Sequence, residues 1–279
     1  MTSKVTFIGA GNMASAIFGG MIDGGYPADM ITATSPEDSA LTQLRDRYGI
    51  NTSGDNNAAV SEADVVVLAV KPNIMRDVCS DLRDSIQARQ PLIVSVAAGL
   101  TAATLDGWLG GGLPIIRCMP NTPSLVGAGA SGLYANAQVS EDQRQLTTTL
   151  LEAVGLVEWV DDETLLEAVT AISGSGPAYF FLVFEALIDA GKRLGLPAES
   201  ARRLALQTGF GAAKMAQQSE YDPAQLKRNV MSPGGTTERA IHSLEDSGLR
   251  QLFDDATQAC ATRARELSEE LSEEIGKKR

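Results

Sequence analysis

The feature that most limits the fold is a glycine-rich turn near the start of the chain. An apolar stretch at residues 5–8 runs into the sequence GAGNMA at residues 9–14, and a helical pattern follows. Gly9 permits a tight turn, Gly11 lets the backbone approach a pyrophosphate, and Ala14 allows the helix to pack closely on the strand. Since a helix N-terminus presents free N–H groups to phosphates, this pattern predicts a dinucleotide site. The alternative is a packing turn of small residues.

Further runs of β-branched and apolar residues follow, with helical patterns between them, and they lie at residues 31–34, 64–70, 92–96 and 115–117. Strands that alternate with helices form βαβ units with a parallel sheet covered on both faces. Beyond residue 159 the strand-like runs vanish and only helical patterns remain. We therefore predict an α/β fold: a Rossmann-type doubly wound parallel sheet at residues 1–160, followed by an all-α domain at residues 161–279.

Composition and charge exclude several classes of protein. With 44% hydrophobic and 21% charged residues, the 279-residue chain is typical of a globular protein. The net charge of −12 opposes binding to nucleic acid or to an anionic membrane. We expect no targeting segment and no apolar stretch of the ~20 residues that a membrane span needs, and hence a cytoplasmic protein. One histidine, His242, and three scattered cysteines show no metal-ligand spacing, so no metal is expected.

The end of the second predicted strand bears on the choice of cofactor. Sites that prefer NAD place an acidic residue there to hold the ribose 2′-hydroxyl. Here Thr34 and Ser35 occupy that place, and their hydroxyls could bind a 2′-phosphate instead. No arginine follows directly. The pattern favours NADPH, with NADH as the weaker alternative.

Three more turns follow predicted strands, at the edge where ligands bind in open α/β sheets. The sequences AVKP at residues 69–72 and AAG at residues 97–99 offer small side chains and a proline, which suit a surface close to a flat ring. Ordinary βα turns are the alternative. The sequence RCMPNTP at residues 117–123 forms a rigid turn that could wall the nicotinamide.

The helical half contains the sequence SPGGTT at residues 232–237, directly before a predicted helix. Successive N–H groups and three hydroxyls at a helix N-terminus form an anion site. A small carboxylate would fit there. The alternative is a well-capped glycine turn.

Together, these segments resemble the pyrroline-5-carboxylate reductase family. The matching sequences, in family order, are IGAGNM at 8–13, AVKP at 69–72, SVAAGLT at 95–101, RCMPNTP at 117–123, AISGSGPAYFF at 171–181 and LKRNVMSPGGTT at 226–237. They cover most of the chain, and the combination of MPNTP, SGSGPAY and SPGGTT is highly specific. The resemblance implies reduction of L-1-pyrroline-5-carboxylate to L-proline, the last step of proline biosynthesis. It also implies a homodimer with interleaved helices, which in this family commonly assembles into a decamer.

The turns and the resemblance together give the predicted site. The resemblance implies that Asn56 contacts the adenosine ribose and that Glu220 lies near the ring nitrogen of the substrate. The predicted cofactor contacts are Gly9, Gly11, Asn12, Met13, Thr34, Ser35, Asn56, Ala69, Lys71, Pro72, Ala97, Met119, Pro120 and Asn121. The predicted substrate contacts are Ser232, Gly235, Thr236 and Thr237.

Thr237 and Glu220 are the predicted catalytic residues. The Thr237 hydroxyl would hydrogen-bond the substrate nitrogen or help to deliver a proton, and Glu220 would stabilise a positive nitrogen. One alternative is a related two-domain reductase acting on another imine or on a 2-hydroxy acid, with Lys192 or Lys214 as the catalytic lysine. Another is a non-catalytic NADP-binding regulator, which would not need the anion site at residues 232–237.

Overall fold

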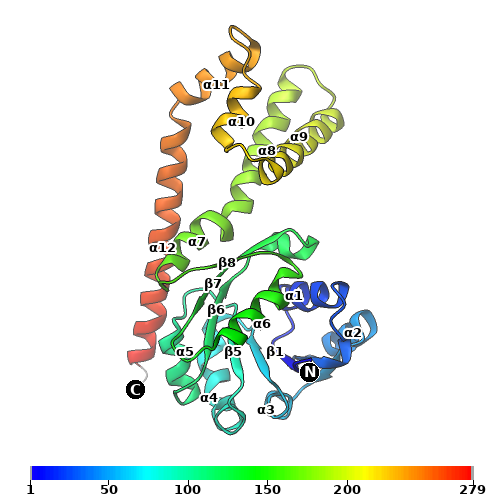
Figure 1. Ribbon diagram of the computed structural model, residues 1–279, viewed down its shortest axis with the longest axis vertical. Helices are drawn as coiled ribbons and strands as arrows, with labels where there is room; N and C mark the ends of the chain where they lie inside the picture. Colours follow the sequence, from blue (N-terminus) through cyan, green and yellow to red (C-terminus); the bar gives the residue numbers. More distant parts are fainter. Residues whose placement is uncertain (1, 278–279) are drawn as a thin grey trace. The chain divides into compact units, whose positions relative to one another are not determined.

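The computed structural model describes residues 2–277, with side chains as far as Leu271, and these residues form two compact units (Figure 1). Unit 1 contains the chain up to Ser175 and again from Cys260 onward. Unit 2 is the segment Gly176–Ala259. The predicted domain boundary after residue 160 stays a prediction, because these units are divided by compactness alone.

Unit 1 is built on an eight-stranded sheet in the order β3-β2-β1-β4-β5-β6-β7-β8. The strands are β1 (Val5–Ile8), β2 (Ile31–Thr34), β3 (Asn51–Ser53), β4 (Val65–Leu68), β5 (Leu92–Ser95), β6 (Ile115–Met119), β7 (Gly129–Ala135) and β8 (Gly155–Trp159). All neighbouring strands are parallel except β6 and β7. The predicted doubly wound α/β fold is confirmed, with one antiparallel pair that was not predicted.

Helices cover both faces of this sheet. They are α1 (Asn12–Asp23), α2 (Asp38–Tyr48), α3 (Asn56–Val60), α4 (Pro72–Arg89), α5 (Ala102–Leu109), α6 (Glu141–Glu152) and α7 (Leu165–Val169), with short turns η1 (Ala28–Met30) and η2 (Thr122–Val126) and the π-helical turn η3 (Thr170–Gly174). Val65 and Val67 of β4 pack with α1, α2 and α6, whereas Val66 and Leu68 pack with α3, α4 and α5. Both faces of the strand are buried, which is why its sequence is a continuous apolar run.

Unit 2 is helical, as predicted. It contains α8 (Gly176–Arg193), α9 (Ala198–Gln218), α10 (Pro223–Asn229), α11 (Thr236–Asp246) and the first part of α12 (Leu249–Lys277), which belongs to unit 1 from Cys260 onward. Helix α10 was not predicted. It begins at Asp222-Pro223, where the Asp222 side chain accepts a hydrogen bond from the Gln225 N–H at 2.7 Å and proline suits the first position of a helix.

Many large apolar side chains are exposed on unit 2. Every residue of this unit is described, and its only buried hydrophobic side chains are Ala201 and Ala205. Phe180, Phe181 and Leu182 of α8 are each more than 60% exposed. A helical unit with so small a core of its own needs a partner to bury its apolar faces.

The expectation that no apolar stretch reaches the length of a membrane span was wrong. Among the described residues, the helical run Leu165–Arg193 has the length and the apolar composition that could cross a membrane, because α7, η3 and α8 follow one another without a break. Only 11% of the most apolar window is buried within the chain.

Candidate active site

Four turns, those after β1, β2, β4 and β5, meet along one edge of the sheet in unit 1. The register pairs Ile8 with both Thr34 and Leu68, and Leu68 with Ser95, so these parallel strands end side by side. The chain order reverses at β1, which has β2 on one side and β4 on the other. In open α/β sheets, this switch point at the carboxyl ends of the strands is where ligands bind.

The glycine-rich turn after β1 has the geometry that its sequence predicts. Gly9 has φ +100°, and a Cβ there would lie 2.9 Å from the carbonyl oxygen of Ala69. Only glycine permits that close approach of the two turns. Gly11 is the N-cap of α1, and a Cβ built on it meets no atom within 4 Å. The surface in front of the helix N-terminus is therefore open, which fits a bound pyrophosphate, and Asn12 and Met13 begin the helix there.

The two hydroxyls at the end of β2 differ in their surroundings. Thr34 is buried, and its Oγ1 accepts a hydrogen bond from the Gly9 N–H at 3.3 Å and donates to the Phe7 carbonyl at 3.4 Å. It holds the glycine turn in place. Ser35 is partly exposed, and its Oγ accepts from the Glu37 N–H at 3.2 Å. Of the two, Ser35 is the residue whose hydroxyl remains open to a 2′-phosphate.

Four further predicted contacts lie at helix starts or in a turn along this edge. Asn56 is the first residue of α3, where the Asp55 side chain accepts hydrogen bonds from two backbone N–H groups. Lys71 is the exposed N-cap of α4, and Pro72 is its first residue. Ala97 is buried in the turn after β5. The structure thus places all three turns at the carboxyl end of the sheet.

The MPN segment after β6 contacts the SGSG segment of residues 173–176. Asn121 is buried; its Nδ2 donates to the Ser173 carbonyl at 3.0 Å, and its Oδ1 accepts from the Ala130 N–H at 2.9 Å. A Cβ on Gly174 would lie 2.8 Å from Cε of Met119. The small residues of SGSG therefore let η3 pack against the segment predicted to wall the nicotinamide.

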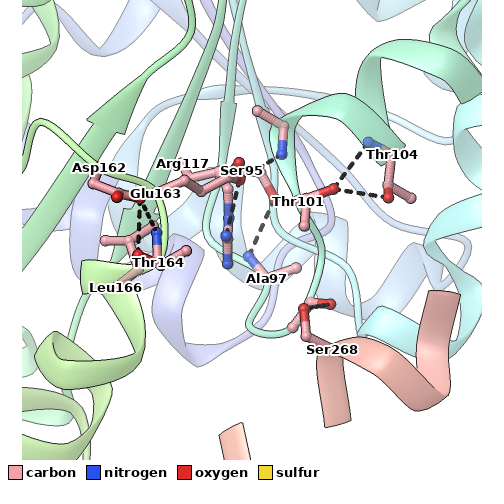
Figure 2. A network of polar contacts seen from close by, with 12 residues as sticks. Ser95, Ala97, Thr101, Thr104, Arg117, Asp162, Glu163, Thr164, Leu166 and Ser268 are labelled. Atoms are coloured by element: carbon pink, nitrogen blue, oxygen red, sulfur yellow. Dashed lines mark hydrogen bonds and ion pairs between the residues drawn. The ribbon is translucent and has the colours of Figure 1, made fainter. Parts of the chain in front are cut away.

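A cavity of about 770 Å³ lies in unit 1 next to these turns. Lys71 and Pro72, two of the predicted cofactor contacts, line it. Sequence reasoning missed three other lining residues that make hydrogen bonds here: Arg117, Glu163 and Ser268 (Figure 2). Arg117 stood inside a matched segment and could have been found, whereas nothing in the sequence of α12 indicates that Ser268 returns to the sheet.

Cys118 immediately precedes Met119 but is not a nucleophile. Burial raises the pKa of its thiol to about 12, so the reactive thiolate is not populated near neutral pH. Burial raises the pKa of Cys79 to about 12 in the same way. Both side chains serve as small apolar core residues, as expected. Cys260 differs, because it is half-buried and lines the cavity.

The predicted substrate residues lie in unit 2. Gly234 has φ +72°, and the Gly235 N–H donates to the Ser232 carbonyl at 2.9 Å, which closes a tight turn before α11. Gly235 is the N-cap and has no side chain, and Thr236 and Thr237 are the first two residues of the helix. Glu220 is exposed in the connection between α9 and α10. The structure thus confirms a helix N-terminus at the SPGGTT segment.

These features define a class of protein: an NAD(P)-dependent oxidoreductase with a Rossmann-type sheet and a separate helical unit. Residues 4–99 match the family model "NADP oxidoreductase coenzyme F420-dependent", and residues 163–267 match the model "Pyrroline-5-carboxylate reductase dimerisation". The second match covers the helices whose apolar faces unit 2 leaves exposed.

Individual relatives narrow the class to one family. The chain is 50% identical over 272 residues to the pyrroline-5-carboxylate reductase of Pseudomonas aeruginosa, covering 98% of this chain and 99% of the relative. A solved structure of the reductase from Coxiella burnetii has 47% identity and a TM-score of 0.93, covering 96% of this chain and 99% of that one. The Plasmodium falciparum enzyme, solved with NADP bound, has 30% identity and a TM-score of 0.84, covering 95% and 98%. The chain belongs to the pyrroline-5-carboxylate reductase family.

Proposed function

We propose that the two units divide the work of the family's reaction, the reduction of L-1-pyrroline-5-carboxylate to L-proline. The cofactor edge of unit 1 binds NADPH, and the N-terminus of α11 in unit 2 holds the substrate carboxylate. When bound, NADPH supplies the hydride that is added to the C=N carbon. The observation that carries the proposal is the meeting of four turns at the carboxyl edge of the sheet, with open space in front of Gly11.

The carboxylate site rests on the turn at residues 232–237. The first N–H groups of a helix have no partner within the helix, and they attract a negative charge. Gly235 is the N-cap of α11 and has no side chain that could accept these N–H groups, so they are available to a ligand carboxylate. Thr237 lies in the first turn of the same helix, where its hydroxyl would reach the ring nitrogen of a substrate held by its carboxylate.

Glu220, the second predicted catalytic residue, would stabilise the positive charge on the substrate nitrogen. A protonated iminium accepts hydride far more readily than a neutral imine. Glu220 is exposed on a loop, and an ionised carboxylate there would favour the protonated form. No step of this scheme requires a metal.

The environment of Lys192 does not favour the alternative of a related reductase that uses a catalytic lysine. Lys192 is 45% exposed at its side chain, and its Nζ lies 2.7 Å from Oδ1 of Asp189 one turn earlier in α8. A lysine that acts as a general base is usually buried and has a lowered pKa. Lys192 is instead a surface residue in an ion pair.

The family match at residues 163–267 implies an oligomer. We further propose that the assembly is a homodimer, or a larger assembly of dimers such as a decamer, and that the protein acts in the cytoplasm. Proline biosynthesis consumes soluble metabolites and NADPH, which supports that location.

The decisive assay follows NADPH oxidation with several acceptors. We expect rapid oxidation with L-1-pyrroline-5-carboxylate, and slower oxidation with a six-membered cyclic imine and with a panel of 2-keto acids. A keto acid with a higher kcat/KM would assign the protein to the hydroxy-acid reductases. NADPH binding without oxidation of NADPH by any acceptor would favour the regulator.

A further inference from the structure

The Glu163 carboxylate joins two segments of unit 1 that carry predicted cofactor contacts. Its Oε1 accepts a hydrogen bond from the Ala102 N–H at 2.7 Å and another from Nη1 of Arg117 at 2.9 Å (Figure 2). Ala102 is the first residue of α5 and ends the turn that contains Ala97. Arg117 lies in β6, shortly before Met119. A single oxygen atom therefore ties the turn after β5 to the strand that leads into the MPN segment.

This contact is shielded from water. The side chains of Arg117 and Glu163 are only 13% and 23% exposed. Charge-assisted hydrogen bonds are shorter and stronger than neutral ones, and removing one partner of a shielded pair leaves the other charge without compensation. The carboxylate also lies at the N-terminus of α5, where a negative charge is favoured. Loss of Glu163 would therefore release both the helix start and the arginine.

The same turn is held at a second point. The Ser268 hydroxyl of α12 donates to the Gly99 carbonyl at 3.0 Å, and Thr101 caps α5 by accepting the Thr104 N–H at 3.1 Å. Ala98, Gly99 and Thr101 all line the cavity that contains Lys71. The pairing of β5 with β6 ends at Ser95 and Arg117, and beyond that pair the Glu163 carboxylate joins the end of the turn to β6.

We propose that Glu163 is a positioning residue for cofactor binding. It sets the distance between the turn at Ala97 and the MPN segment that follows β6, and it does so without touching the cofactor itself. The proposal rests on the proposed function, since that function assigns both segments to the nicotinamide. A purely structural ion pair would stabilise unit 1 without changing cofactor affinity.

Three variants separate positioning from stability. In Glu163→Ala we expect the KM and the Kd for NADPH to rise by about 10-fold or more, the scale of a lost charge-assisted hydrogen bond. Glu163→Gln keeps an oxygen acceptor for both donors and should stay within about 3-fold of the wild type. Asp162→Ala is the matched control, because it removes the neighbouring carboxylate. In the described structure that carboxylate accepts hydrogen bonds from the backbone N–H and the hydroxyl of Thr164. This variant should leave NADPH affinity unchanged.

The measurements are steady-state kinetics, NADPH titration by fluorescence and melting temperature. The KM for L-1-pyrroline-5-carboxylate should stay within about 2-fold in all variants, because the substrate carboxylate is held in unit 2. If Glu163→Ala is too unstable to purify, Glu163→Asp takes its place, since its shorter side chain cannot span both donors and should also raise the KM for NADPH.

An unchanged NADPH KM in the Ala or Asp variant, with a lowered melting temperature, would overturn the positioning role. Equal loss in Glu163→Gln and Glu163→Ala would also contradict it, because the hydrogen bonds would then not matter. The wild-type enzyme reports separately on the proposed function: if it fails to oxidise NADPH with the imine, the reaction assignment is wrong, whereas the effect of Glu163 on the NADPH Kd can still be read.

Discussion

Ser35 and Thr34 show how neighbouring residues of the same chemistry can have different roles. The Thr34 hydroxyl accepts a hydrogen bond from the Gly9 N–H and donates one to the Phe7 carbonyl, whereas Ser35 is partly exposed at the predicted cofactor edge. The sequence pattern alone could not separate them, because strand alternation decides which side chain faces the core.

Replacing Ser35 with Asp should shift the cofactor preference toward NADH. A carboxylate repels a 2′-phosphate and can hold a 2′-hydroxyl, so we expect the ratio of kcat/KM for NADPH over NADH to fall by roughly 10-fold, or about 1.4 kcal/mol. Ser61→Asp is the control, since it adds the same charge near Lys4 and Asp64, which precede β1 and β4. A ratio that does not change in Ser35→Asp would remove Ser35 from the cofactor site.

Thr237 is the residue on which the chemistry depends most. Since Gly235 is the N-cap of α11, Thr237 is not in the capping position, which weakens a purely structural role. Thr237→Ala should lower kcat by about 10- to 100-fold, the equivalent of losing a hydrogen bond worth roughly 1.5–3 kcal/mol to a charged group. Thr237→Ser should keep most of the activity.

Two readouts complete the Thr237 test. The Kd for NADPH should barely change, because the pyrophosphate turn belongs to unit 1. Ser243→Ala, in the same helix, controls for general effects on helix stability. Full activity in Thr237→Ala would eliminate its catalytic role and leave Glu220 as the remaining candidate.

At the scale of helices, Glu245 connects three elements of unit 2. It lies in α11 and accepts hydrogen bonds from Arg250 of α12, at 2.7 and 2.8 Å, and from Lys227 of α10, at 3.1 Å. The hydrogen bonds from Arg250, and to a smaller extent the one from Lys227, lower the pKa of Glu245 from 4.5 to about 2. A lowered carboxyl pKa in the folded state contributes stability above the unfolded pKa, and this is lost as the pH falls through the folded value.

Glu245→Gln should therefore lower the melting temperature at pH 7 more than at acidic pH. The gap to the wild type should be full above a pH of 4.5 and should narrow steadily between 4.5 and about 2. Melting curves by circular dichroism at pH 3 to 7 measure this, with Asp246→Asn as the control in the same helix. A gap that is independent of pH would show that charge at Glu245 does not matter.

The strands that the sequence predicted correctly are the ones buried on both faces. The strands β1, β2, β4, β5 and β6 carry apolar runs because helices cover both sides of them. The missed strands lie elsewhere: β3 has the polar sequence NTS, β7 is rich in small residues, and β8 alternates between exposed and half-buried positions. Their pairing depends on the neighbouring strand, which local sequence does not report.

The candidate site was predictable to a similar degree. Tight turns carry glycines and prolines, so the turn at Gly9 after β1 and the SPGGTT turn before α11 could be located from sequence. Contacts such as Glu163 with Arg117 depend on tertiary structure, and 46 positions separate the two residues.

For the whole molecule, the exposed apolar surface of unit 2 predicts an obligate assembly. We expect light scattering to give at least a dimer at assay concentrations, because obligate interfaces are large and hydrophobic. Phe181→Glu, at a position 64% exposed in α8, should dissociate the assembly and abolish activity. Val126→Glu, at a position 79% exposed in η2, adds the same charge outside the dimerisation match and should leave the assembly intact. An active monomer in light scattering at assay concentrations would contradict this prediction.

The chain leaves unit 1 at Ser175 and re-enters it at Cys260, and the side chains of these two residues lie 3.2 Å apart. Unit 2 is thus an insertion whose two ends meet. Ribosomes make proteins from the N-terminus, and early domains fold first during synthesis. The part of α12 that lines the cavity is synthesised only after all of unit 2 has left the ribosome. A growing chain therefore has its cofactor turns in place before Ser268 can reach Gly99, so the pocket is finished only late in translation.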